Sequence, residues 1–164
     1  MLAFVEQANN ANQPDAFSAG YLRALDCMKG LRLLHPNQFQ VNEAWIAFKL
    51  NDTPIHIELD GDFNFFALMD AASCFIFCSA PVSVKSVEPS TVESRQLLNE
   101  GKVYKMQLPK ILFIPTEQPA KFLVTEAERI GIEVVRVEEN QLLIFIGEAR
   151  KGFRDRFGGG QIGN

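Results

Sequence analysis

The sequence has 164 residues, of which 47% are hydrophobic and 22% are charged. That length suits one ordinary domain, and the composition is globular rather than disordered or coiled-coil. The net charge of −4 argues against nucleic-acid binding by the whole surface, because phosphate-binding domains usually carry a basic excess. We expect a single domain over 1–164 with mobile tails at 1–13 and 158–164.

The N-terminal part of the chain predicts an amphipathic helix. Apolar residues recur every three or four positions from Ala16 to Leu34, and the residue before Pro36 is pushed out of the helical region. We expect His35 to cap the last carbonyls of this helix. The first residues lack the basic start and apolar core of a signal peptide, and no run approaches the roughly 20 apolar residues of a membrane span. A cytoplasmic location is expected.

The next part of the chain reads as an antiparallel meander. Residues 45–50 predict a first strand, and the alternating residues 55–60 predict a second that ends at Asp60. Gly61-Asp62 is expected to break that strand. Further strands are expected over 64–69 and 74–79, and 82–87 is either one more short strand or a connection.

The second half of the chain predicts a βαβ unit and therefore a parallel pair of strands. Ser90 with Glu93 opens a short helix expected to end at Gly101. The segments that follow are a strand over 110–114, a helix over 119–130 with Gly131 as its cap, and a strand over 133–137. Residues 138–157 contain an apolar run that fits a strand, but the charged residues around it favour a helix, which we prefer.

No motif for a cofactor is present. The sequence has no phosphate-binding glycine loop and no nucleophile elbow, so we expect no cofactor. The three cysteines, Cys27, Cys74 and Cys78, lack metal-binding spacing and are expected to be buried, reduced thiols. The histidines, His35 and His56, have no metal partners by spacing, and His56 is expected at the surface.

Carboxylates supply the candidate chemistry. Two-metal phosphoryl-transfer sites use acidic residues brought together from separate elements. Asp60, Glu117 and Glu148 are the catalytic candidates on that basis. No metal site is expected, and Asp60 and Asp70 are the candidate ligands if one exists. The simpler interpretation of Asp60, Asp62 and Asp70 is that they are turn residues.

A basic cluster near the C-terminus offers a different function. Arg150, Lys151, Arg154 and Arg156 could contact phosphates, with Phe153 or Phe157 stacking on bases. The alternative is a solvated helix face whose phenylalanines pack on the core.

The order of the expected elements resembles the ribonuclease H-like fold. The segment IELDGDFNFFALMDAASCFIFCSAPVS (57–83) resembles the first hairpin of integrase and transposase cores, with Asp60 on the position of the first catalytic acid. The segment PKILFIPTEQPAKFLVTEAERIGIEVVRV (109–137) looks like the strand–helix–strand that follows. The chain is also similar to an uncharacterised bacterial family that keeps this outline without the acidic triad.

The resemblance implies a degenerate member of that fold. In integrase and transposase cores the strand after the first helix ends in Asp, whereas here Ile114-Pro115-Thr116 precedes Glu117. Glu148 would stand at the final acidic position. We therefore expect a non-catalytic binding or protein-interaction module, with a protein partner or a second copy as its target and no membrane contact. The alternatives are a divalent-metal-dependent nuclease using Asp60, Glu117 and Glu148, and nucleic-acid binding through residues 150–157.

Overall fold

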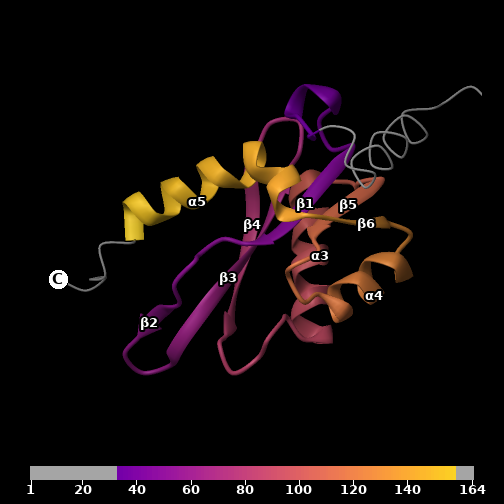
Figure 1. Cartoon of the computed structure of the whole chain (residues 1–164). Coiled ribbons are helices and arrows are strands. Elements are labelled where there is room, and N and C mark those ends of the chain that lie inside the picture. Colours follow the sequence, from indigo (N-terminus) through magenta and orange to yellow (C-terminus); the bar gives the residue numbers. More distant parts are fainter. Residues whose placement is uncertain (1–32, 158–164) are drawn as a thin grey trace, which may run out of the picture.

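The computed structural model describes residues 33–157, which form a mixed sheet with helices on both faces (Figure 1). The strands are β1 (Ala44–Lys49), β2 (Ile55–Ile57), β3 (Gly61–Asp70), β4 (Ile76–Ser83), β5 (Ile111–Pro115) and β6 (Glu133–Val137). The helices are α3 (Thr91–Lys105), α4 (Lys121–Arg129) and α5 (Leu143–Phe157), with short 3-10 turns η1 (Pro36–Gln38) and η2 (Glu139–Leu142).

Strand β1 lies at the centre of the sheet. It pairs antiparallel with β3 on one side and parallel with β5 on the other, while β4 and β6 form the outer positions. The antiparallel β1–β3–β4 group is thus joined to a parallel β1–β5–β6 group, with α4 as the crossover between β5 and β6. The expected meander, βαβ unit and final helix are confirmed, with α5 beginning at Leu143 after the η2 turn.

Each face of the sheet has its own apolar core. Along β1, Ile46 and Phe48 point to the side covered by α5, where they meet Phe145. Trp45 and Ala47 point to the opposite side, against α3 and α4. Burial on both faces explains why β1 and β5 are almost continuously apolar, since neither strand has a solvent side.

The β2–β3 hairpin differs from the expected strand and break. Ile57 pairs with Gly61, so residues 58–60 form the hairpin loop and β2 is three residues long. Gly61 has φ +94°, a conformation that glycine adopts without strain, and it begins β3 rather than breaking a strand. Asp60 therefore lies in a loop and does not end a strand. Figure 1 shows this hairpin projecting from the helical part of the molecule.

Two further boundaries differ from expectation. Strand β4 runs without interruption from Ile76 to Ser83, because it pairs with β3 along its length through one irregularity at Leu68 and Met69. Helix α3 continues past Gly101 to Lys105. Gly101 is buried against Trp45, Phe77 and Leu68, so the missing side chain permits close packing rather than ending the helix.

Most of the expected N-terminal helix and both expected tails lie outside the described residues. Leu33, Leu34 and His35 are not helical, and Leu34 is buried in the core beneath α5. His35 caps the start of η1, where its Nδ1 accepts a hydrogen bond from Asn37 N, instead of closing a preceding helix. Pro36 suits the first position of η1, because proline is favoured in the first turn of a helix. No helix within 33–157 has the length and apolarity needed to cross a bilayer.

Candidate functional site

Asp60 and Asp70 occupy opposite ends of β3 and have different surroundings. Asp60 is exposed in the hairpin loop, where its backbone N–H donates to the Ile57 carbonyl at 3.1 Å. Asp70 is fully buried at the end of β3. Its carboxylate accepts hydrogen bonds from Asn42 N at 2.6 Å and from Ser73 N and Oγ at 2.9 and 2.7 Å. Asp70 therefore holds the turn before β4 and ties it to the start of β1.

Glu117 lies in the turn after β5, where it links that turn to η2. Its Oε1 accepts from Thr116 Oγ1 at 2.9 Å, and its Oε2 accepts from the backbone N–H of Glu139 in η2 at 2.8 Å. Burial pushes the pKa of Glu117 up, but these hydrogen bonds and the nearby Arg136 charge outweigh it and hold the pKa below its usual range. Glu117 is an ionised structural link between the β5–α4 turn and η2.

A network of charged and amide side chains, together with the backbone of Lys49, lies beside Glu117 at the carboxyl ends of β1, β5 and β6. We call this network the strand-end junction. Its members are Lys49, Glu117, Gln118, Arg136, Glu139 and Arg150. Arg150 of α5 donates to the Lys49 carbonyl at 3.1 and 3.0 Å and to the Glu139 carboxylate. The junction thus fastens α5 and η2 to the ends of the strands.

Arg136 closes the β5–α4 turn from the neighbouring strand. One of its Nη atoms donates to the Pro115 carbonyl at 2.9 Å and to the Gln118 carbonyl. Gln118 in turn accepts from Lys49 N at 2.7 Å through Oε1. These bonds hold the backbone of the β5–α4 turn and the neutral amide of Gln118 at the ends of the strands.

Glu148 is exposed on α5 and, like Asp60, is not a member of the strand-end junction. Across residues 33–157, the His, Cys, Asp and Glu side chains form no group of three or more that could hold a metal ion. Asp60, Glu117 and Glu148 are therefore not assembled as a metal-binding group. His56 is at the surface and bonds Asp62 at 2.7 Å across the β2–β3 pair.

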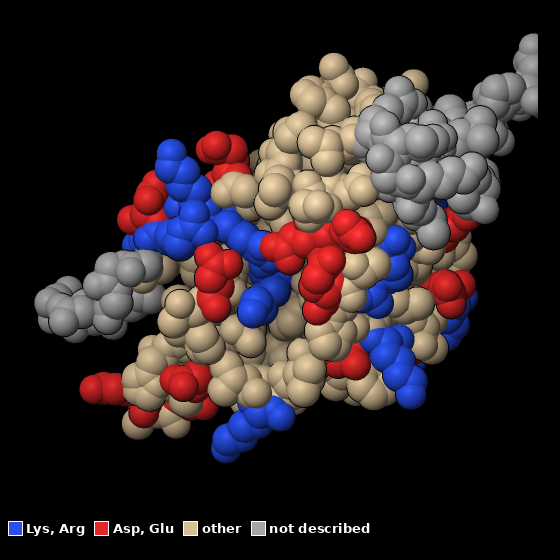
Figure 2. Space-filling view, viewed as in Figure 1, with Lys and Arg blue, Asp and Glu red and all other residues tan. Residues whose placement is uncertain are grey.

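The basic cluster on α5 is partly used within the molecule. Arg150 belongs to the strand-end junction, and Arg154 pairs with Asp52 at 2.7 Å. Lys151 and Arg156 are exposed. Figure 2 shows the cationic side chains around α5 beside acidic ones rather than as a continuous basic surface. Phe153 packs against Phe65 and Phe157, so it covers the sheet next to the core.

The two described cysteines are unpaired and poorly suited to nucleophilic chemistry. Burial, helped by the Glu100 charge, raises the pKa of Cys78 to about 12. Burial and the Asp70 charge also raise the pKa of Cys74. Since the thiolate is the reactive form, both thiols stay protonated at neutral pH.

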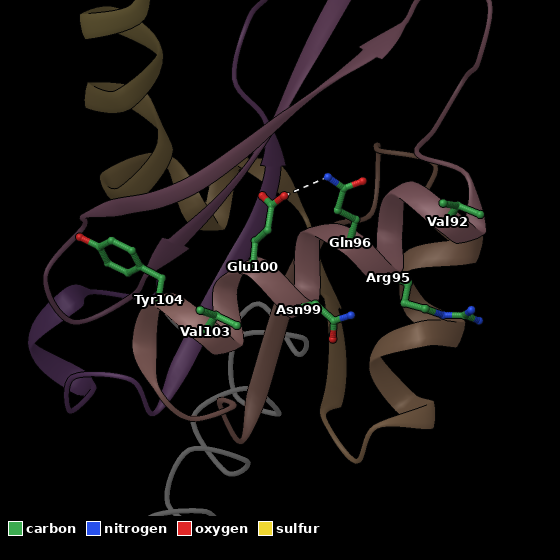
Figure 3. A pocket seen from close by; sticks show the side chains of 7 residues that line it. All are labelled: Val92, Arg95, Gln96, Asn99, Glu100, Val103 and Tyr104. Carbon is green, nitrogen blue, oxygen red and sulfur yellow. Dashed lines mark hydrogen bonds between the residues drawn. The ribbon is translucent and has the colours of Figure 1, made fainter.

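The outward face of α3 is a surface that the sequence interpretation missed. It forms a shallow open pocket of about 560 Å3 lined by Val92, Arg95, Gln96, Asn99, Glu100, Val103 and Tyr104. Figure 3 shows these side chains following one another along the helix, with Gln96 donating to Glu100 at 3.0 Å. The spacing of Val92, Gln96, Asn99 and Val103 by four, three and four residues can be read from the sequence, but a helix that ends at Gly101 leaves Val103 outside it.

The apolar character of this face increases toward the C-terminal end of α3. Val103 is 77% exposed, and the next turn adds Met106, which is 90% exposed. Tyr104 stacks against Phe75 and Phe77, with ring centroids 6.3 and 6.0 Å apart. Phe75 is itself exposed. We call the combined surface, made of the seven α3 side chains above together with Phe75 and Met106, the α3 face.

Comparisons with known proteins find similarity at the level of solved structures. No family model and no curated protein sequence matches the chain. The chain is similar to the catalytic core domain of BIV integrase, with 10% identity and a TM-score of 0.47, over 70% of this chain and 68% of that one. It is also similar to a chain of the simian T-cell lymphotropic virus intasome in complex with PP2A regulatory subunit B56 gamma. That match has 10% identity and a TM-score of 0.41, and it covers 76% of this chain and 45% of that one.

Proposed function

We propose that this chain is a non-catalytic protein-interaction module, and that the α3 face is its contact surface. The observation that carries the proposal is the group of exposed apolar side chains at the C-terminal end of α3. Val103 is 77% exposed and Met106 is 90% exposed, and Tyr104 stacks beside them on the exposed Phe75. Apolar side chains grouped on one surface mark sites of protein contact, whereas scattered single ones do not.

The placement of the acidic residues supports the same proposal. Asp60 lies in the β2–β3 loop, Glu148 is exposed on α5, and both Glu117 oxygens accept hydrogen bonds from the protein. A two-metal nuclease needs carboxylates that converge on ions about 3.5–4 Å apart. The strand-end junction is held by arginine and amide contacts, which suit a structural joint better than a cation site.

Thermal unfolding with and without Mn2+ or Mg2+ tests the proposal. A cation that binds the native state selectively must raise the melting temperature. We expect no increase, and no metal-dependent cleavage of single- or double-stranded DNA or RNA. A Mn2+-dependent increase that is lost in Asp60→Asn, Glu117→Gln and Glu148→Gln but kept in Glu128→Gln would overturn it, because Glu128 is exposed on α4 and serves as the matched control.

The nucleic-acid alternative is tested by measuring oligonucleotide binding at several salt concentrations. Lys151, Arg154 and Arg156 are the exposed cations of the α5 cluster, and Arg154 is paired with Asp52. If they formed a phosphate-binding surface, binding to a single-stranded oligonucleotide would weaken steeply with salt and would fall in Lys151→Gln. Such binding would overturn the interaction-module proposal, and we expect none at low salt.

A further inference from the structure

The exposed side chains of α3 follow the spacing of a coiled-coil seam. Val92, Gln96, Asn99 and Val103 are separated by four, three and four residues, and Met106 follows three residues later. Alternating steps of three and four keep side chains on one stripe of a helix that faces another helix. Among residues 33–157 no element covers this stripe, since all of its members are exposed.

Opposite charges line the two sides of this stripe. At about 100° per residue, Arg95 and Lys102 fall on one side, and Glu93 and Glu100 fall on the other. In heptad terms the basic residues precede each of Gln96 and Val103, and the acidic residues follow each of Val92 and Asn99. Residues on these flanking positions set the orientation of paired helices.

The charge pattern favours parallel pairing of two copies of this helix. When two identical helices pair in parallel, the basic side of each faces the acidic side of the other. Arg95 then lies opposite Glu100 of the second copy, five residues further along. In antiparallel pairing each side faces itself, so that cations meet cations and carboxylates meet carboxylates, which is unfavourable.

Arg95 can serve this contact and its internal one together. Its Nε and one Nη donate to Glu126 on α4 at 3.1 Å each, and its side chain is still 51% exposed. A guanidinium has five N–H donors, so a second carboxylate can be bound from the solvent side. The link to Glu126 also limits the motion of Arg95, which lowers the entropy lost when the new pair forms.

We propose that α3 associates with α3 of a second copy of this chain in parallel orientation, forming a two-fold symmetric dimer. The proposal rests on the proposed function and names its partner. The seam combines Val92, Val103 and Met106, which supply apolar burial, with Gln96 and Asn99, whose amides lower affinity while fixing the register of the two helices. Because a single helix face buries a small area, the dimer is expected to be weak and reversible.

Sedimentation velocity of the full chain over a concentration series tests the association. The wild type should convert from monomer to dimer within a range of about 1 µM to 1 mM, which brackets dissociation constants of weak complexes. Val103→Glu and Glu100→Arg should each weaken association at least about tenfold, the first by charging the seam and the second by placing two cations opposite each other. Glu128→Arg makes the same charge change on the exposed side of α4 and should leave association unchanged.

Disulfide cross-linking tests the orientation. Val92→Cys and Val103→Cys are placed singly in a chain whose native cysteines are replaced, with circular dichroism to confirm folding. Parallel pairing brings each position next to its own copy, so each variant should cross-link with itself on mild oxidation. Antiparallel pairing would instead cross-link the two variants with each other in a mixture.

The outcomes separate this inference from the proposed function. A wild type that stays monomeric over the whole series, or a dimer unaffected by Val103→Glu and Glu100→Arg, would overturn the α3 dimer. Cross-linking solely between positions 92 and 103 would overturn its parallel orientation. Neither result bears on metal-dependent cleavage, whose detection would overturn the proposed function independently.

Discussion

Gly101 is the residue at which α3 comes closest to the sheet. A Cβ atom built at this position would lie 3.0 Å from ring atoms of Phe77 and Trp45 and 3.1 Å from a Leu68 methyl group. All three neighbours belong to a buried core and have little room to move. The glycine is therefore a packing requirement, although glycine in a helix interior lowers helix stability by roughly 0.5–1 kcal/mol.

Gly101→Ala should destabilise the protein despite the better helix propensity of alanine. Overpacking typically costs about 1–3 kcal/mol, which exceeds the propensity gain. Gly147→Ala on α5 is the matched control, because a Cβ there would meet nothing within 4 Å. Urea unfolding should show a lower free energy of unfolding for Gly101→Ala and an equal or higher one for Gly147→Ala. Equal stabilisation by both substitutions would contradict the packing explanation.

Glu126 joins α3 to α4 and is the ionic contact between these two helices within the described residues. It is 4% exposed, and its carboxylate accepts from Arg95 of α3 at 3.1 Å and from Arg129 of α4 at 2.9 Å. The hydrogen bond from Arg95 lowers the pKa of Glu126 most, and Arg129 lowers it further, against the opposing effect of burial. The folded state therefore binds the Glu126 proton less tightly than the unfolded chain does.

A lowered pKa makes the contribution of Glu126 to stability depend on pH in a definite direction. That contribution is fully present above the unfolded pKa of about 4.3 and is lost as the pH falls through the folded value. Glu126→Gln should lower the melting temperature at pH 7, and the difference from wild type should shrink as the pH falls below about 4. The exposed Glu128→Gln should differ little from wild type throughout. A difference for Glu126→Gln that grows at acidic pH would contradict this account.

The elements were predictable where local pattern and tertiary environment agree. The β5–α4–β6 unit combines two apolar runs with Gly131, whose φ of +87° suits the end of a helix. The C-terminal end of α3 was not predictable, since a glycine inside a helix and a glycine that ends one look alike in sequence. Helix α3 ends instead at Lys105, and its C-cap Met106 adopts φ +61° without being glycine.

The candidate site was less predictable than the fold because its contacts join distant parts of the chain. Arg136, Glu139 and Arg150 meet Lys49 and Glu117 through the strand order, and no spacing in the sequence links them. Period-two alternation predicts a strand that runs to Asp60. That alternation continues through Leu59, but Ile57 pairs with Gly61, so the hairpin loop occupies residues 58–60.

In the molecule as a whole, helix α3 exposes apolar side chains on its outer side. Helix α5 covers one face of the sheet, while α3 and α4 cover the other and are tied together by Glu126. A dimer formed through the α3 face would bury Val92 and Val103 without changing either core. Dimerisation would then stabilise the folded chain by an amount that depends on the protein concentration.

The melting temperature should then rise with protein concentration. A partner at 100 times the dissociation constant adds about 2.7 kcal/mol to the stability of the native state. For a domain of this size each kcal/mol corresponds to roughly 2–4 °C, so the expected rise is about 5–10 °C between dilute and concentrated samples. In Glu100→Arg, where Arg95 would face a second cation, the melting temperature should change far less with concentration. A wild-type value that is constant over the series would contradict dimerisation of the folded chain.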